Sequence, residues 1–415
     1  MQIVADIGGM PGKDCNGFCK YCYFKKVKDI KTFGCSNCLP HKIGCEKCSK
    51  GIHEQVTDFK TPFEVLTEVQ NTLMMNPFGE EEIKVNISGG GDLSCYPHLE
   101  ELTNGFNQLS IPIHLGYTSG KGLKDEKIVS QLINNGVDEV TFTLFANDVN
   151  LRHEWVRDPN PESSLHACKT FAENTELHAA SVIIPGVNDG KVLHHTCESL
   201  ESWGAKALIL MRFANTFNEG LILGNGPLLT DYDSQPVSEF EELVKQINSE
   251  YNLRITGTPV CDPETGAPFA LSKKENEVFL QFIGEVRGEA TIISSKIASP
   301  YIAKIFDKIS DDVNVVSVDK EIGCLITKED LEAIDLSDVK ESVILPGRSF
   351  VHPLDAQKIL SSDGIDRVVG RGPDTLTVDG ELSGTLTDEN IIERELEQFN
   401  ELIEAINFFG MKRIN

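Results

Sequence analysis

Two patterns of hydrophobic and polar residues alternate along the first part of the chain and predict its fold. Residues 83–88 alternate between apolar and polar side chains, as a strand with one buried face does. Upstream, Val65 and Val69 stand at helical spacing after Thr61 and Pro62, which are typical of a helix start. The same two patterns then repeat in turn. They predict strands at residues 2–7, 83–88, 112–117, 139–145, 177–184, 206–211 and 253–257, and helices at residues 99–109, 124–134, 162–174, 190–203 and 236–251.

This alternation of strands and helices indicates an α/β fold with a parallel sheet. We expect a partial (β/α)6-type barrel, in which the loops after the carboxyl ends of the strands meet at one rim and carry the chemistry. The first strand runs into a group of cysteines, and the second runs into Gly89, Gly90 and Gly91. We therefore expect the cysteines and the glycines at the same rim.

The regular pattern stops at a segment, residues 258–268, that contains three prolines. We expect a first domain at residues 1–263 and a C-terminal α+β domain at residues 264–415, with the boundary inside this segment. In the second domain the apolar pattern predicts strands at residues 278–283, 290–293 and 313–318, a hairpin-like turn at residues 378–381 and a helix at residues 389–408.

Composition narrows the function classes. The chain has 415 residues, of which 38 are Lys or Arg and 64 are Asp or Glu, so its formal net charge is −26. Such a charge repels nucleic acid phosphates, so we expect no nucleic acid partner. We also expect no membrane-spanning segment and no secretory signal, and hence a cytoplasmic location in which thiols stay reduced.

Cys15, Cys19 and Cys22 form a C-x3-C-x2-C motif directly after the first predicted strand. Three thiolates on one short loop suit three irons of a [4Fe–4S] cluster, because soft sulfur ligands match iron–sulfur chemistry. No fourth cysteine belongs to the triplet, so one iron would stay open to a substrate or cofactor. The alternative is a zinc site that takes its fourth ligand from a neighbouring segment.

A second group of cysteines lies within residues 34–50. Its four members, in two C-x2-C pairs, are Cys35, Cys38, Cys45 and Cys48. Four thiolates at this spacing suit one tetrahedral metal, either Zn²⁺ or a mononuclear iron, and a second iron–sulfur cluster is the alternative. We expect the metal to stiffen the loop, although an electron relay would use the same ligands.

The cysteine triplet and the segment Ser88–Asp92 together resemble the radical S-adenosylmethionine (SAM) enzymes. In that superfamily the amino and carboxylate groups of the SAM methionine chelate the open iron, and a glycine-rich segment lies against the amino group. The resemblance implies that the three glycines and Asp92 bind SAM, because glycine lets the backbone approach closely and an acid suits an ammonium.

Four more residues join this expected SAM site. Ser119 lies just past the third strand, where its hydroxyl would reach the ribose, and a plain turn residue is the alternative. The resemblance implies that Tyr21 and the stretch around Ile183 contact the adenine. Tyr23 follows the last cysteine directly. We hypothesise that its phenol approaches the open iron when SAM is absent, and a packing role is the alternative.

A narrower resemblance covers the whole chain. The segment Asp6–Gly9, the pair Tyr23–Phe24 directly after the triplet, the four-cysteine loop and the Gly-Gly-Gly-Asp segment look like methanogenesis marker protein 10, a family of methanogenic archaea. That family is similar to cobalamin-dependent radical SAM methyltransferases. The resemblance implies a post-translational modification: methylation of the sp3 δ-carbon of an arginine in the α subunit of methyl-coenzyme M reductase.

The resemblance also implies partners and a third cofactor. The third cofactor is a cobalamin held by the C-terminal domain, and the partner besides the substrate protein is an electron donor. The cluster would need an anaerobic cell to survive. None of the ten histidines lies in an Asp-x-His-x-x-Gly signature, so a histidine below the cobalt is not expected. A substrate guanidinium favours acidic residues at the rim, and Asp148 and Asp189 lie near strand ends. The alternative for each is a turn or cap residue.

Other functions remain open from the sequence alone. One is a radical SAM peptide or protein maturase without a corrinoid. Others are an iron–sulfur electron-transfer or scaffold protein, which the missing fourth cysteine disfavours, and a zinc-ribbon binding module, which would leave the strand–helix array without a role.

Overall fold

The structure is a computed structural model. It describes residues 2–26, 58–75, 83–216, 219, 227–259, 262–347, 349, 351–373 and 387–410. The four-cysteine loop and the predicted turn at residues 378–381 lie outside these residues.

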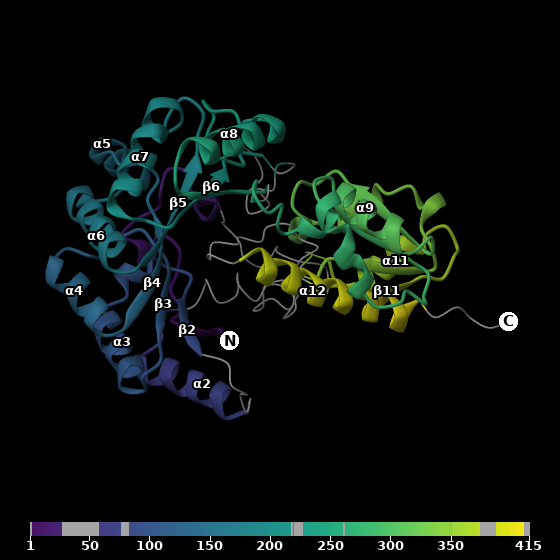
Figure 1. The fold of residues 1–415 in the computed structure, drawn as a ribbon, viewed down its shortest axis with the longest axis horizontal. Helices are drawn as coiled ribbons and strands as arrows, with labels where there is room; N and C mark the ends of the chain where they lie inside the picture. The colour runs from purple at the N-terminus through teal and green to yellow at the C-terminus, as the bar shows by residue number, and fades with distance from the viewer. Residues whose placement is uncertain are drawn as a thin grey trace. The chain divides into compact units, whose positions relative to one another are not determined.

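Seven strands form a parallel sheet in which spatial order follows chain order (Figure 1). They are β1 (Gln2–Asp6), β2 (Lys84–Ser88), β3 (Ile113–Thr118), β4 (Val137–Thr143), β5 (Glu176–Ile183), β6 (Ala207–Arg212) and β7 (Arg254–Thr258). Each lies where the alternating pattern predicts a strand. Among the described residues β1 and β7 are not paired, so the sheet is an open, partial barrel and the predicted α/β fold is confirmed.

Helices connect these strands and cover one side of the sheet (Figure 1). They are α2 (Pro62–Met75), α3 (Leu99–Gln108), α4 (Glu126–Asn134), α5 (Val149–Leu151), α6 (Pro161–Asn174), α7 (Gly190–Trp203) and α8 (Val237–Glu250). Local chemistry sets their ends. The Glu64 carboxylate accepts from the backbone N–H of Thr61 at 2.7 Å, which closes a capping box. Gly204 adopts φ 84° after the last turn of α7, where glycine ends a helix without strain.

Strand register brings the first two loops of the rim together. Asp6 at the end of β1 pairs with Ser88 at the end of β2. Residues 7–15 and 89–92 therefore leave the sheet side by side. Apolar side chains below this rim are fully buried, for example Ile87, Leu115 and Phe142.

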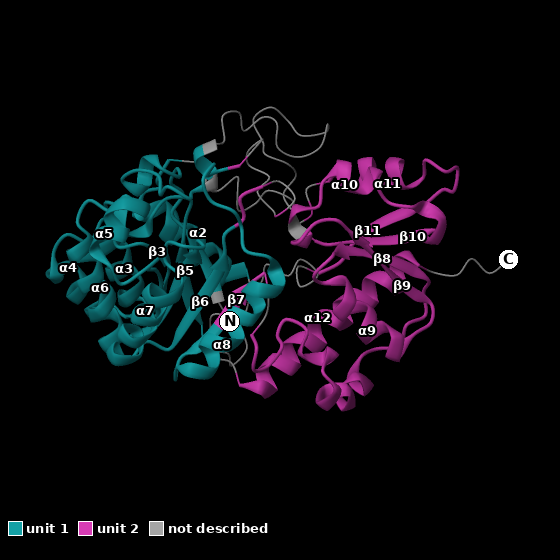
Figure 2. Ribbon diagram, turned by 90° about the horizontal axis from the view of Figure 1, so that it is seen from above, with its two compact units in different colours: residues 1–26, 51–213, 228–255 teal, residues 27–50, 214–227, 256–415 magenta. Residues whose placement is uncertain are grey.

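The chain divides into two compact units (Figure 2). The first comprises residues 1–26, 51–213 and 228–255, and the second comprises residues 27–50, 214–227 and 256–415.

The second unit contains a four-stranded parallel sheet with the order β11-β10-β8-β9. Its strands are β8 (Ala290–Ser295), β9 (Val313–Val318), β10 (Ser342–Leu345) and β11 (Val368–Arg371). Its helices are α9 (Ser299–Ile309), α10 (Lys328–Glu332), α11 (Pro353–Leu360) and α12 (Asp388–Phe409).

This unit differs from the α+β arrangement expected from the sequence. Its strands are parallel and alternate with helices, as in an α/β fold. The last two strands have only four residues each, too few for an alternating pattern to stand out. The strand predicted at residues 278–283 is wrong, because Lys274–Phe282 form a 3-10 helix that buries only Leu280. A short apolar run does not separate these two conformations.

Glu395 of α12 ties the helix to the start of the second unit. Its two carboxylate oxygens accept from the backbone N–H groups of Ala270 and Leu271, each at 2.9 Å. Burial raises the pKa of this carboxyl to about 7, although the two N–H groups act in the opposite direction.

We expect Glu395→Gln to destabilise the fold by about 1–3 kcal/mol, because the amide NH₂ would face one backbone N–H and leave it unpaired. The folded chain holds the Glu395 proton more tightly than the unfolded chain, so this group's contribution to stability falls as pH rises from about 4.5 to about 7. The stability gap between wild type and variant should therefore be larger at pH 5 than at pH 8. Urea unfolding at both pH values measures it, and an equal gap would contradict the assignment.

No helix in the described part of the chain is long and apolar enough to cross a membrane.

Candidate active site

The cysteine loop follows β1 and turns back on itself within the triplet. Asn16 and Gly17 adopt φ values of 51° and 103°, so the chain passes through two left-handed residues between the first and second cysteines. Glycine adopts this conformation without strain. The backbone N–H of Gly12 donates to Cys15 Sγ at 3.3 Å. All three thiols are half-buried, so the loop presents sulfur at the rim and does not bury it in the core.

Burial raises the pKa of all three thiols, and that of Cys22 reaches about 12. The neighbouring Cys19 thiol is the second cause of the raised pKa of Cys22. A bound metal would have to displace these protons. Within the described residues no group of three ligating side chains is placed to hold a single metal ion. A cubane has a different requirement, because each thiolate binds a separate iron.

The glycine segment after β2 packs directly on this loop. The backbone N–H of Gly90 donates to Gly8 O at 2.9 Å, and that of Asp92 donates to Asp14 O at 3.1 Å. A Cβ on Gly91 would lie 2.8 Å from Asp14 O, closer than real contacts allow. The segment therefore needs glycine for close contact with the cysteine loop, in addition to the expected approach to a ligand.

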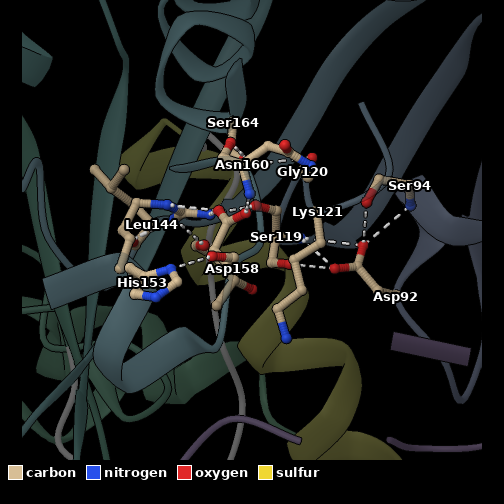
Figure 3. Close-up of polar contacts among 12 residues, drawn as sticks. Asp92, Ser94, Ser119, Gly120, Lys121, Leu144, His153, Asp158, Asn160 and Ser164 are labelled. Atoms are coloured by element: carbon tan, nitrogen blue, oxygen red, sulfur yellow. Dashed lines mark hydrogen bonds and ion pairs between the residues drawn. The ribbon is translucent and has the colours of Figure 1, made fainter. Parts of the chain in front are cut away.

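Asp92 is buried and its carboxylate is committed to protein donors (Figure 3). Oδ1 accepts from Ser94 N at 3.0 Å, from Ser94 Oγ at 2.7 Å and from Thr118 Oγ1 at 3.0 Å. Oδ2 accepts from the hydroxyl of Ser119. This pattern makes Asp92 a link between the loops after β2 and β3, whereas the sequence suggested a direct partner for an ammonium.

Ser119 donates its hydroxyl proton to Asp92, which leaves the oxygen lone pairs free to accept from a ligand hydroxyl. Its carbonyl accepts from Arg152 Nη2 at 2.6 Å. The same guanidinium donates to Leu144 O at 2.6 Å and pairs with Asp158 Oδ2 at 2.7 Å, and both charged side chains are 0% exposed. Arg152 therefore joins the ends of β3 and β4 beneath the rim.

Tyr21 stacks on Phe145 with a centroid distance of 5.1 Å and an interplanar angle of 13°. Its hydroxyl is buried beside the Cys19 thiol, on whose pKa it acts in the direction opposite to burial. Phe145 adopts φ 65°, which is rare for an aromatic residue and indicates local strain. Phe145 in turn stacks on Trp155 at 6.0 Å. An aromatic stack thus supports the cysteine loop.

Asn188 fixes the loop that follows β5. Its Oδ1 accepts from Ile184 N at 2.8 Å, and its Nδ2 donates to Val182 O at 2.8 Å and to Phe145 O at 2.9 Å. Ile183 lies inside this loop anchor, and its carbonyl accepts from Phe213 N at 3.3 Å. The loop expected to contact adenine is thereby hydrogen-bonded to Phe145, on whose ring Tyr21 stacks.

The remaining expected site residues have other positions. Asp148 caps α5 and accepts from Leu151 N at 2.8 Å, and Asp189 accepts from Gly186 N at 3.0 Å in the turn before α7. Both therefore make the local contacts that the cap and turn alternatives require. Tyr23 begins a 3-10 helix, Tyr23–Lys26, but its side chain lies outside the described part of the chain. The four metal ligands expected at Cys35, Cys38, Cys45 and Cys48 lie outside it as well.

Sequence reasoning missed three side chains that organise this rim: Arg152, Asn188 and Lys121. No motif surrounds them, and each joins segments distant in sequence. From the sequence alone, a charged residue such as Arg152 or Lys121 is predicted to face solvent, because charged side chains are seldom fully buried.

Comparison with known proteins identifies the domain. Residues 10–196, which contain the cysteine triplet, the glycine segment, Ser119 and Ile183, match the Radical SAM superfamily. The chain therefore contains a radical SAM domain. No curated protein matches the chain.

Solved structures resemble the chain only distantly. Streptococcus suis SuiB bound to S-adenosylmethionine is 13% identical with a TM-score of 0.40, over 64% of this chain and 52% of SuiB. A radical SAM methyltransferase from Sphaerobacter thermophilus is 15% identical with a TM-score of 0.36, over 61% of this chain and 64% of that one. TsrM from Kitasatospora setae, a radical S-adenosylmethionine methyltransferase, is 10% identical with a TM-score of 0.33, over 50% and 35%. The chain spans about half the length of SuiB, and no conclusion about activity follows from these likenesses.

A radical SAM domain implies a [4Fe–4S] cluster and SAM, and the rim fits both. The three cysteines are half-buried and lie on one loop, and each thiolate of such a loop would bind a separate iron. Ser119 donates its hydroxyl proton to Asp92, so its oxygen keeps lone pairs that could accept from a ligand.

Proposed function

We propose that this chain, which contains a radical SAM domain, is a cobalamin-dependent methyltransferase that acts on the sp3 δ-carbon of an arginine in the methyl-coenzyme M reductase α subunit. The observation that supports the SAM chemistry is the contact of the cysteine loop with the glycine segment, through Asp92 N to Asp14 O at 3.1 Å. The arginine substrate and the corrinoid rest on the sequence resemblance described above.

The cofactors would supply the difficult chemistry, because an unactivated sp3 carbon has no lone pair to attack a methyl group: cluster and SAM give one-electron chemistry, and cobalamin carries the methyl. The chain's own residues bind and orient. Cys15, Cys19 and Cys22 would hold the cluster. Asp92 accepts the hydroxyl proton of Ser119, so the Ser119 oxygen would be able to accept a hydrogen bond from the ribose. The aromatic stack under Tyr21 would exclude water from the reacting groups.

The topology of the second unit supports a place for the corrinoid. In the order β11-β10-β8-β9, the chain leaves β8 toward β9 on one side and later returns to β10 on the other. Parallel α/β sheets bind ligands outside the carboxyl ends of their strands at such a switch point. The buried hydroxyl of Ser299, at the start of the helix after β8, has no hydrogen-bond partner within the described part of the chain. We propose that cobalamin contacts the loops after β8 and β10.

The metal in the four-cysteine loop is proposed from the ligand spacing alone. Iron and zinc analysis of anaerobically purified protein would identify it. Zinc at one atom per chain would support a structural site, and additional iron beyond the cluster would support an electron relay.

The decisive experiment is anaerobic incubation with SAM, a strong reductant, methylcobalamin and an arginine peptide from the presumed target, followed by mass spectrometry. We expect the peptide to gain one methyl group on arginine and 5′-deoxyadenosine to form. Formation of 5′-deoxyadenosine with an altered peptide in the absence of any corrinoid would favour the corrinoid-free maturase. Failure to form 5′-deoxyadenosine at all would contradict radical SAM activity.

A further inference from the structure

Lys121 is a lysine buried at the rim. It follows β3 in the loop that also carries Ser119, and its side chain is 1% exposed. Its ammonium Nζ lies 3.0 Å from Gly17 O and 3.8 Å from Cys19 Sγ. Figure 3 shows the side chain of Lys121 extending away from the carboxylate of Asp92. The lysine therefore crosses from the third strand to the cysteine loop and ends at a sulfur.

The charge of this lysine has no carboxylate partner among the residues that the structure describes. Its two contacts in the described part of the chain are a backbone carbonyl and a thiol, and no Asp or Glu there lies within ion-pair distance. By contrast, the other buried cation of the rim, Arg152, is paired with Asp158 at 2.7 Å. Burying a charge without an opposite charge is costly, so such groups are almost always paired or bound to a ligand. Lys121 thus indicates a negative group at this position.

We propose that Lys121 is the counter-cation of the iron–sulfur cluster and raises its reduction potential. This inference rests on the proposed cluster at Cys15, Cys19 and Cys22. Reduction by a one-electron donor adds one negative charge to the cluster and its three thiolates. A fixed ammonium beside Cys19 Sγ stabilises the reduced state more than the oxidised state, and hydrogen bonds to cluster sulfurs act in the same direction.

A structural role is the competing explanation, because Lys121 also binds the carbonyl of Gly17 and so holds the loop. Two substitutions separate the roles. Lys121→Met keeps an unbranched side chain of similar size and removes the charge, and Lys121→Arg keeps the charge and changes the shape. Lys124, three residues further on, is exposed, so Lys124→Met is the matched control for loss of one positive charge.

The test is a redox titration of each reconstituted protein without SAM, monitored by the electron paramagnetic resonance signal of the reduced cluster. Iron content and circular dichroism are measured on the same samples. For Lys121→Met we expect reduction of the cluster to become at least tenfold less favourable. This corresponds to a reduction potential lower by about 59 mV for one electron. Lys121→Arg and Lys124→Met should stay close to wild type.

Equal potentials in wild type and Lys121→Met would overturn the proposal, as would equal shifts in the Met and Arg variants, since those would follow from shape alone. If Lys121→Met takes up no iron, Lys121→Gln replaces it under the same criteria. Failure of the wild-type chain to hold any cluster would instead refute the proposed function, so the two failures are distinguishable.

Discussion

Replacement of Cys22 by alanine is expected to reduce 5′-deoxyadenosine formation to the background level, a loss of at least about 1000-fold. The reason is that Cys22 would be one of only three cluster ligands, and a cluster with two protein thiolates is not retained. Cys22 also lies on the loop that packs against the glycine segment. Iron content, the spectrum of the reduced cluster and nucleoside analysis after incubation with SAM measure the effect.

Cys168→Ala is the matched control for this experiment. Cys168 is fully buried in α6, and burial raises the pKa of its thiol to about 12, the same as for Cys22. The two thiols thus share a raised pKa but differ in location, and Cys22 is the less buried of the two residues. Cys168→Ala should keep its iron and its SAM cleavage, with a modest loss of packing. If both variants lost the cluster equally, the triplet would not be the cluster site.

Arg152→Met is expected to destabilise the first unit by about 3–5 kcal/mol, the largest stability effect that we expect. The substitution leaves the Asp158 carboxylate buried without its partner, since both side chains are 0% exposed. It also removes the donors to Leu144 O and Ser119 O. Urea unfolding of wild type and variant measures the difference in free energy of unfolding.

The double variant Arg152→Met/Asp158→Leu tests the cause. Replacing both charges removes the unpaired carboxylate, so a large part of the lost stability should return. No recovery would mean that the hydrogen bonds to the two carbonyls, and not the buried charge, dominate the effect. A single variant as stable as wild type would contradict the buried pair.

The sequence predicted the first sheet well because its signal is local. Alternation in residues 83–88 and helical spacing in residues 62–73 each depend on neighbours within a few positions, and β2 and α2 lie there. In the second sheet, β8 and β9 lie where strands were predicted, whereas β10 and β11 were missed because they have four residues each and carry little pattern. Propensity over so short a segment does not decide between strand, turn and 3-10 helix.

The rim could be predicted only where chemistry is encoded by spacing. The cysteine triplet and the glycine segment come from short motifs, and the structure brings the two segments together through Asp14 O. The contacts of Asp92 depend on Ser119, 27 positions away, and those of Lys121 depend on Cys19, 102 positions away. Such pairs can be identified only once the strands are aligned, because no local pattern around either residue indicates its partner.

The contacts of Asp92, Arg152 and Asn188 connect loops that follow four different strands, and this has a consequence for how the rim behaves as a whole. Loops that are hydrogen-bonded to one another lose conformational entropy during folding. Little more conformational entropy is then lost when a ligand binds. Ligand capture should then demand little ordering of the protein, and amides of these loops should exchange with solvent together as one cooperative group.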